Sequence, residues 1–153
     1  MSSRPTICSQ SWGVGRRRTE GIPIQIGLRA IELARRVDDP NVEVAASYAT
    51  ARTLAAMGER EEAQRISEAM LIPAERLRNQ LSLIDALWMN GTLRNAEGSW
   101  QDTRALLERI IVLRPTQSRA HADLAVMDCQ VGDMDQGKAH VERLLENPPA
   151  GFA

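Results

Sequence analysis

Aromatic residues, cysteines and long apolar runs are all scarce in this sequence. Phe, Trp and Tyr together supply 3% of its 153 residues, which argues against a β-sandwich, whose strands favour Val, Thr and Tyr. Cys8 and Cys129 stand in unrelated contexts and offer no disulfide framework, so we expect a reducing, cytoplasmic setting. No apolar run approaches the roughly 18 residues of a membrane-spanning helix, and no continuous apolar segment near the N-terminus would serve as a signal peptide.

An excess of one charge is missing as well. The sequence has 19 Lys and Arg residues against 20 Asp and Glu residues, a net charge of −1, so we expect no general attraction to nucleic acid or to a membrane surface. The first 22 residues differ, with four arginines and one glutamate. Three of these arginines are adjacent, at Arg16–Arg18, but a short basic cluster in a tail binds phosphate weakly. We interpret it as part of a solvated tail.

No pattern of catalytic, cofactor-binding or metal-binding residues is present. There is no Ser–His–Asp order, P-loop or cofactor motif, and Gly13–Gly15 lacks the last glycine of a dinucleotide-binding fingerprint. His121 and His140 lie 19 residues apart, and a metal site would need them to converge with Cys129 or an acid. We therefore expect a protein that is not an enzyme, with no cofactor and no metal.

The sequence does contain a pattern that repeats at a step of 34 residues. A period of this length is typical of a helix–turn–helix unit, which buries its apolar face only against its neighbours. The identical pairs at this step are Ala86 and Ala120, Gly98 and Gly132, Ala105 and Ala139, Glu108 and Glu142, Arg109 and Arg143, and Pro115 and Pro149. The prediction is an all-α chain of stacked helix pairs.

Apolar periodicity, turn glycines and prolines predict about seven helices. Residues 1–22 have no helical or strand period and are interpreted as a disordered tail, residues 23–149 as the helical repeat domain, and residues 150–153 as a second tail. The step from Gly58 to Gly98 is 40 residues, and we place the six extra residues between Pro73 and Arg78. The predicted helices start and end near Ile24 and Asp38, Val42 and Met57, Glu59 and Leu71, Glu75 and Ala96, Trp100 and Leu113, Gln117 and Val131, and Met134 and Glu146.

Read in this register, the chain resembles a tetratricopeptide-repeat (TPR) protein from about Ile24 to Pro149. The family's large residue, small residue, turn glycine, second small residue and closing proline are matched by Leu87, Gly91, Gly98, Thr103 and Pro115 in one repeat, by His121, Ala125, Gly132, Gly137 and Pro149 in the next, and, without the proline, by Ser47, Ala51, Gly58 and Ala63 in the first. The usual Trp is absent from all three. The resemblance implies an α–α superhelix, or solenoid.

A second resemblance concerns the segment from Ala30 to Pro40. It is similar to repeats in large bacterial signalling proteins, namely class III nucleotide cyclases, signal-transduction ATPases and transcription activators. This similarity implies a regulatory or sensory array whose effector domain is not in this chain. The helix beginning near Ile24 then counts as half a repeat, and its Leu28 and Ile31 form a candidate edge for a homodimer.

Stacked helix pairs form a curved surface whose concave wall is lined by the first helix of each pair. The side chains expected to face this groove and bind a partner are Tyr48, Arg52, Asp85, Trp88, Thr92, Asn95 and Arg119. Tyr, Trp and Arg are the residue types that dominate binding energies at interfaces. The sequence therefore predicts a scaffold that binds a protein or peptide in its groove. The alternative is that Tyr48 and Trp88 are core residues.

Overall fold

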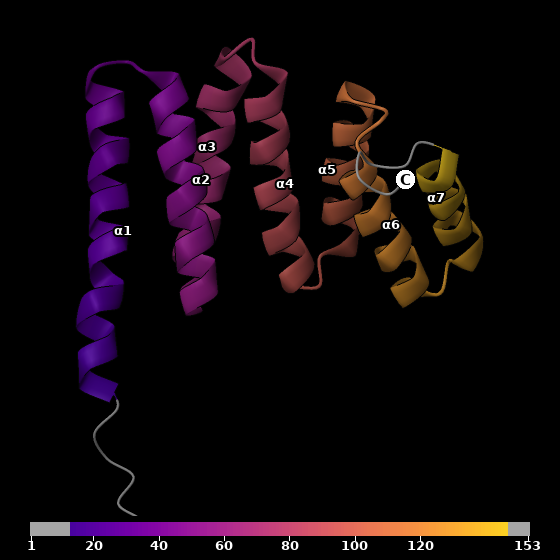
Figure 1. The fold of residues 1–153 in the computed structure, drawn as a ribbon, viewed down its shortest axis with the longest axis horizontal. Helices are drawn as coiled ribbons and strands as arrows, with labels where there is room; N and C mark the ends of the chain where they lie inside the picture. The colour runs from indigo at the N-terminus through magenta and orange to yellow at the C-terminus, as the bar shows by residue number, and fades with distance from the viewer. Residues whose placement is uncertain (1–12, 147–153) are drawn as a thin grey trace, which may run out of the picture.

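The computed structural model describes residues 13–146, with side chains from residue 23 onward, and the described part of the chain is built from helices alone (Figure 1). The seven helices of this range are α1 (Gly13–Arg36), α2 (Pro40–Met57), α3 (Arg60–Arg76), α4 (Gln80–Ala96), α5 (Trp100–Leu113), α6 (Ser118–Val131) and α7 (Met134–Glu146). The predicted all-α class is confirmed.

The helices form antiparallel hairpins that stand side by side in chain order. Helices α2 and α3, α4 and α5, and α6 and α7 are the paired partners, and α1 packs on α2. Figure 1 shows the row running from α1 at one end to α7 at the other. The arrangement is a solenoid, because each unit contacts its neighbours rather than a common centre.

The predicted turn glycines occupy the tips of these hairpins. Gly58, Gly98 and Gly132 have φ angles of 86°, 80° and 87°, a left-handed conformation that glycine adopts without the steric cost of a Cβ atom. The starts of α2 and α4 are capped by side chains. Asp39 accepts hydrogen bonds from the backbone N–H groups two and three residues on, and Asn79 accepts one from the N–H of the residue two positions on.

The start of the first helix differs from the sequence-based expectation. We expected helix from Ile24 and a tail without secondary structure up to residue 22, but α1 already begins at Gly13. The expectation is therefore wrong for residues 13–22, while residues 1–12 and the short tail at 150–153 lie outside the described residues. The segment is rich in Arg, a good helix former. Extending a helix that is already nucleated needs no amphipathic pattern.

The end of the third helix also differs. Pro73 does not end it, because α3 continues to Arg76 with Pro73 and Ala74 buried in the core. A proline inside a helix removes one backbone hydrogen bond, and here the Leu77 N–H still donates to the Pro73 carbonyl at 3.1 Å. Helices α3 and α4 have 17 residues each, and α5 and α6 have 14 each. The six extra residues therefore lengthen both helices.

The core consists of two clusters of buried side chains that meet at α4. The first cluster joins α1, α2, α3 and α4, and the second joins α4, α5 and α6. The last helix, α7, contributes Gly137 as its one buried residue within the described range. The main members are Ile31, Val44, Leu54, Ile66, Met70 and Met89 in the first cluster, and Ile84, Leu87, Leu107, Ile110, Leu124 and Met127 in the second.

Candidate partner-binding face

The seven side chains expected to face the groove lie on α2, α4 and α6, the first helices of the three hairpins. None of them is buried in the core. Tyr48 and Trp88 are half-buried, and the other five, Arg52, Asp85, Thr92, Asn95 and Arg119, are exposed. This placement follows from the helical period, because positions three to four residues apart share one face of a helix. Their role in binding a partner remains a prediction.

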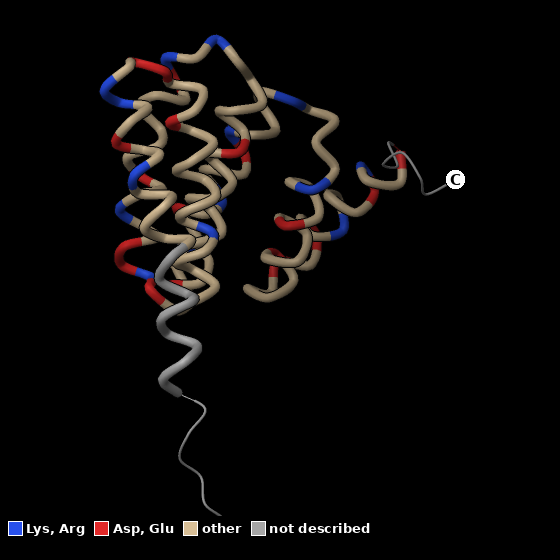
Figure 2. The backbone as a smooth tube through the Cα atoms, turned by 60° about the vertical axis from the view of Figure 1, so that its left-hand side comes forward, with Lys and Arg blue, Asp and Glu red and all other residues tan. Residues whose placement is uncertain are grey.

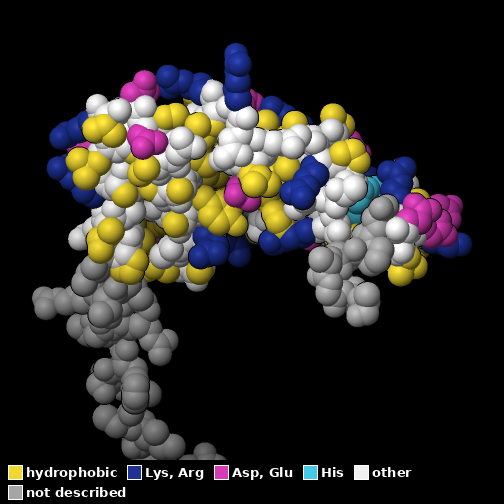
Figure 3. All heavy atoms as spheres, turned by 45° about the horizontal axis from the view of Figure 1, so that its top comes forward, with side chains coloured by type: hydrophobic (Ala, Val, Ile, Leu, Met, Phe, Trp, Pro, Cys, Tyr) yellow, Lys and Arg dark blue, Asp and Glu magenta, His cyan; other side chains and the backbone are white. Residues whose placement is uncertain are grey.

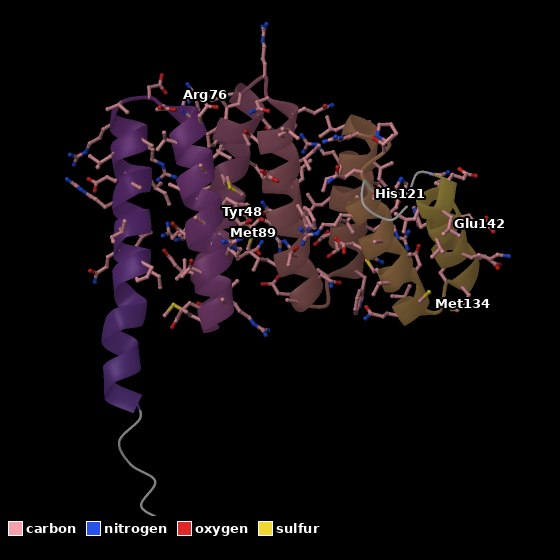
Figure 4. All side chains as sticks on the ribbon, in the orientation of Figure 1. Tyr48, Arg76, Met89, His121, Met134 and Glu142 are labelled. Carbon is pink, nitrogen blue, oxygen red and sulfur yellow. The ribbon has the colours of Figure 1, made fainter. Side chains whose placement is uncertain are left out.

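On α2, Tyr48 and Arg52 form a pair one helical turn apart. The guanidinium carbon of Arg52 lies 5.9 Å from the centroid of the Tyr48 ring, within the range of a cation–π contact. Tyr48 also packs against the first core cluster, of which Met89 is a member, and Figure 4 labels both residues near the middle of the row of helices. Packing against the core therefore holds the Tyr48 side chain in place while part of it stays exposed.

On the face formed by α2, α4 and α6, the helices α4 and α6 lie farther apart than α2 and α4. The backbones of α2 and α4 pack against each other, whereas no such direct approach joins α4 and α6 within the described chain. The gap is spanned by side chains, since the Arg119 guanidinium lies over the Trp88 ring, 2.8 Å from its centroid. Trp88 thereby has one face covered by a cation and its base packed against the second core cluster.

Beside this pair is a hollow of about 250 Å³. Besides Trp88, its apolar lining comes from Gly91 on α4, Leu107 on α5, and Val126 and Met127 on α6. Its polar lining consists of hydroxyl, amide and carboxylate groups, namely Thr92, Asn95, Thr103, Asp123 and Gln130. An apolar base with a few convergent polar groups is typical of a recognition pocket.

Two carboxylates of this region are partly shielded from water. Burial raises the pKa of Asp85 on α4 above its ordinary value. Burial also raises the pKa of Asp123 on α6, and the positive charge of Arg119 opposes that rise. Charged groups that have lost part of their hydration gain more from a new hydrogen-bond donor than fully solvated groups do.

The wall carries no large region of one charge. Figure 2 shows Lys and Arg interspersed with Asp and Glu along the described helices. Many of these charges are paired on the surface, such as Arg94 with Glu68 and Arg109 with Glu75, at 2.5 Å and 2.7 Å. Exposed pairs of this kind contribute little to stability.

A polar cluster that was not expected from the sequence lies at the other end of the molecule. The Nδ1 atoms of His121 on α6 and His140 on α7 lie 3.0 Å apart, and the carboxylate of Asp128 pairs with Arg104 on α5. The available signal was the repeat register, in which the two histidines replace Leu87 and Leu106. His140 is partly buried, as predicted, whereas His121 is buried, with 4% of its surface exposed. Across the described residues, no group of three or more His, Cys, Asp or Glu side chains is arranged to hold a metal ion.

Of the two residues expected to form a homodimer edge, Ile31 is buried and Leu28 is exposed. Ile31 belongs to the first core cluster and is 5% exposed, so that residue is not on a free edge. Leu28 lines a hollow between α1 and α3 together with Ile31 and Ile66. The exposed large apolar side chains of α1 are Ile26, Leu28, Leu33 and Val37, so Leu28 stays accessible at this edge.

Comparison with known proteins shows the fold. No protein-family model matches the chain, and no curated protein matches it. Among solved structures it is similar to BtubC from P. vanneervenii, with a TM-score of 0.70 and 17% identity over 84% of this chain and 56% of that one. It is also similar to MamA, with a TM-score of 0.64 and 18% identity over 93% of this chain and 77% of that one. The chain thus has a TPR-like solenoid fold, and it spans little more than half the length of BtubC. Within the described range, no helix has the length and apolar character needed to cross a bilayer.

Proposed function

We propose that this chain is a non-catalytic scaffold that binds a protein or peptide partner on the face formed by α2, α4 and α6. The observation that carries the proposal is the hollow between α4 and α6, bordered by Trp88 and Arg119. We further propose that it acts in the cytoplasm and that its partners do not include nucleic acid, in keeping with a net charge of −1.

The hollow suits an apolar side chain carried by a partner segment. Leu107 and Met127 offer an apolar base, while Asn95 and Gln130 present amide groups that donate to and accept from a backbone. A segment lying along the wall would also reach the Tyr48 and Arg52 pair on α2. Partly buried aromatic side chains with an Arg neighbour are the usual centres of binding energy at interfaces.

The decisive variants are Trp88→Ala and Arg119→Ala, with Trp100→Ala as the matched control. Trp100 begins α5, outside the set of residues lining the hollow, and is 39% exposed. Partners are first captured from native lysate with the wild-type chain and identified, and their Kd values are then measured with each variant. Truncating a central residue costs about 2 kcal/mol or more, which corresponds to roughly 30-fold weaker binding.

Circular dichroism checks that the variants keep their helices. We expect Trp88→Ala and Arg119→Ala to lose binding and Trp100→Ala to keep it. If the Trp88 variant binds each identified partner as tightly as the wild type, this face is not the binding site.

A second candidate rests on the outward face of α1. Ile26 and Val37 are 65% and 73% exposed there, and Leu33 lies between them on the same face. Solenoid ends normally carry a polar capping surface, so this apolar face suits cover by another element. One proposed cover is a preceding segment of a bacterial cyclase, ATPase or transcription regulator, with this chain as its regulatory repeat part. The other is a second copy of the chain.

Two measurements distinguish a preceding segment from a second copy of the chain as the element that packs on α1. Light scattering after gel filtration reports the oligomeric state of the wild type and of Leu33→Glu, which should be monomeric if α1 forms a dimer. The DNA upstream of the first codon shows whether an in-frame effector domain precedes the chain. A monomeric wild type together with an upstream stop codon would remove both ideas without affecting the proposed α2–α4–α6 face.

A further inference from the structure

The cluster between α6 and α7 has a hydrogen-bond order that its geometry fixes. His121 Nε2 lies 3.1 Å from the Pro115 carbonyl oxygen, and His121 Nδ1 lies 3.0 Å from His140 Nδ1. A carbonyl oxygen only accepts, so His121 Nε2 carries a hydrogen and donates it. In the neutral ring, His121 Nδ1 is then an acceptor, and His140 Nδ1 must carry the hydrogen between the two rings.

These hydrogen-bond assignments leave one ring nitrogen of the two histidines that can accept a further proton. Both nitrogens of His121 and the Nδ1 of His140 are occupied, so the remaining site is His140 Nε2. That nitrogen faces the Oδ2 atom of Asp128 at 3.8 Å, which is beyond hydrogen-bond reach. Oδ2 is itself buried and has no hydrogen-bond partner within the described range, while Oδ1 pairs with Arg104.

The charges around His140 come from three helices. From α6 it faces His121 and Asp128, and from α7 the positive charge of Arg143 acts on it. Arg104 reaches it from α5, and Glu108 of α5 and Asp135 of α7 line the adjoining hollow. Burial lowers the pKa of His140, and the negative charge of Asp128 only partly opposes this effect. The histidine side chains form a small cyan area at the α7 end in Figure 3.

The helix that carries His140 is weakly attached. Helix α7 packs against α6 alone, and Gly137 is its one buried residue in the described range. Met134, Val141 and Leu145 are exposed. A terminal element with few buried apolar contacts opens at a lower free energy than the core of the same protein.

We propose that the docking of α7 on α6 depends on the protonation state of His140. His121 and His140 share one hydrogen while α7 is docked on α6, and a second proton, which enters at His140 Nε2, loosens α7 from α6. The proton finds no hydrogen-bond acceptor within reach in the docked state, whereas a solvated imidazolium in the undocked helix donates to water.

The sign of the effect follows from linkage. The docked state holds the pKa of His140 below its usual value of about 6.5, so the undocked state binds the proton more readily. Docking is therefore strongest above about pH 6.5 and weakens as the pH falls toward the pKa of the docked state. Between the two pKa values, the docking equilibrium changes by up to about tenfold for each pH unit.

The first test uses the wild-type chain. Long-range ¹H–¹⁵N spectra of the imidazole rings near pH 7.5 should show the hydrogen on Nε2 of His121 and on Nδ1 of His140. Amide-exchange protection factors across α7 should then fall by up to about tenfold per pH unit on acidification, while those of α2 to α4 stay constant. A hydrogen on Nε2 of His140 at neutral pH, or an α7 protection independent of pH, would overturn the proposal.

The variant His140→Gln removes the titrating group and keeps a polar side chain. Its α7 protection factors should no longer change with pH. The matched control is Glu142→Gln, which removes a titrating carboxylate on the exposed side of α7, where it pairs with Lys138 at 3.8 Å (Figure 4). This control should follow the wild-type profile. If His140→Gln loses protection with acid as the wild type does, another group is responsible.

Discussion

The two ends of this solenoid are held together by different means. From α1 to α4 the helices share one apolar cluster, and α2 and α4 pack directly against each other. From α4 to α7 the helices make fewer direct contacts. Side chains span the gap between α4 and α6, and α7 is held on α6 by a polar cluster and one buried glycine. We infer that the N-terminal helices contribute most of the stability, whereas the C-terminal helices contain the hollow and the less firmly packed helix.

The different connection of α4 and α6 explains where the hollow lies. Two adjacent first helices that touch leave no space between them, whereas a gap bridged by Trp88 and Arg119 leaves room beside the bridge. Both kinds of contact involve α4, which packs against α2 on one side and is separated from α6 on the other within the described chain.

The largest expected effect is that of Met70→Ala in the first cluster. Met70 is fully buried among α1–α4, and truncating a buried Met to Ala leaves a cavity that costs about 2–5 kcal/mol. Urea unfolding followed by circular dichroism measures the loss. If the N-terminal cluster carries the stability, the whole transition moves to lower urea. A loss confined to one part of the transition would contradict that role.

The next effect is expected at the contact of α1 with α2. A Cβ atom at Gly27 would clash with the Thr50 side chain, and Thr50 is fixed by the hydrogen bond from its Oγ1 to the Ala46 carbonyl at 2.7 Å. Gly27→Ala should therefore destabilise the chain by about 1–3 kcal/mol, although alanine favours a helix. The same urea titration measures it. Gly27→Ala combined with Thr50→Ala should recover most of the loss, and a failure to recover would refute the steric explanation.

A smaller and more local effect is expected at Gly137 on α7. A Cβ atom there would lie 3.0 Å from Cys129 Sγ and 3.3 Å from the Ala125 carbonyl oxygen, so α7 has to shift outward. We expect Gly137→Ala to cost about 1 kcal/mol and to lower amide protection in α7 alone, because among the described helices α7 packs against α6 alone. Equal losses in α2 to α4 would show that the two ends are more strongly coupled than their packing indicates.

The repeat step made much of this fold predictable. Gly58, Gly98 and Gly132 were placed correctly at the turns, and the predicted bounds of α5 and α7 agree with the structure, because turn chemistry and apolar periodicity are local. The continuation of α3 through Pro73 was not predictable in this way. It depends on the burial of Ala74 against other helices, which a local pattern does not contain.

The candidate site was predictable only in part. Helical register identified which side chains of α2, α4 and α6 share a face, since that depends on spacing within one helix. The contribution of Asp123 and Gln130 to the hollow depends on the distance between α4 and α6. The contact of His121 with His140 likewise depends on how two helices pack. Neither distance is encoded in the period of a single helix.

The smallest expected change, and the one that most sharpens the comparison, is at Gly91 on α4. A Cβ atom there would meet only Leu106 Cβ, at 3.8 Å, which is an ordinary contact. Gly91→Ala should therefore stabilise the chain by about 0.5–1 kcal/mol, because alanine is the better helix former. This is opposite in sign to Gly27→Ala, although both substitutions are made inside a helix.

Gly91 also lines the hollow beside Trp88, so the added methyl group narrows the space offered to a partner. We expect Gly91→Ala to raise the midpoint of urea unfolding and to weaken binding of an identified partner, whereas substitutions that merely destabilise the chain lower both. A gain in stability together with a loss of binding would show that the space beside Gly91 is a binding site. It would not be a packing defect of the core. A variant that is more stable and binds as tightly as the wild type would show that the partner does not enter the hollow.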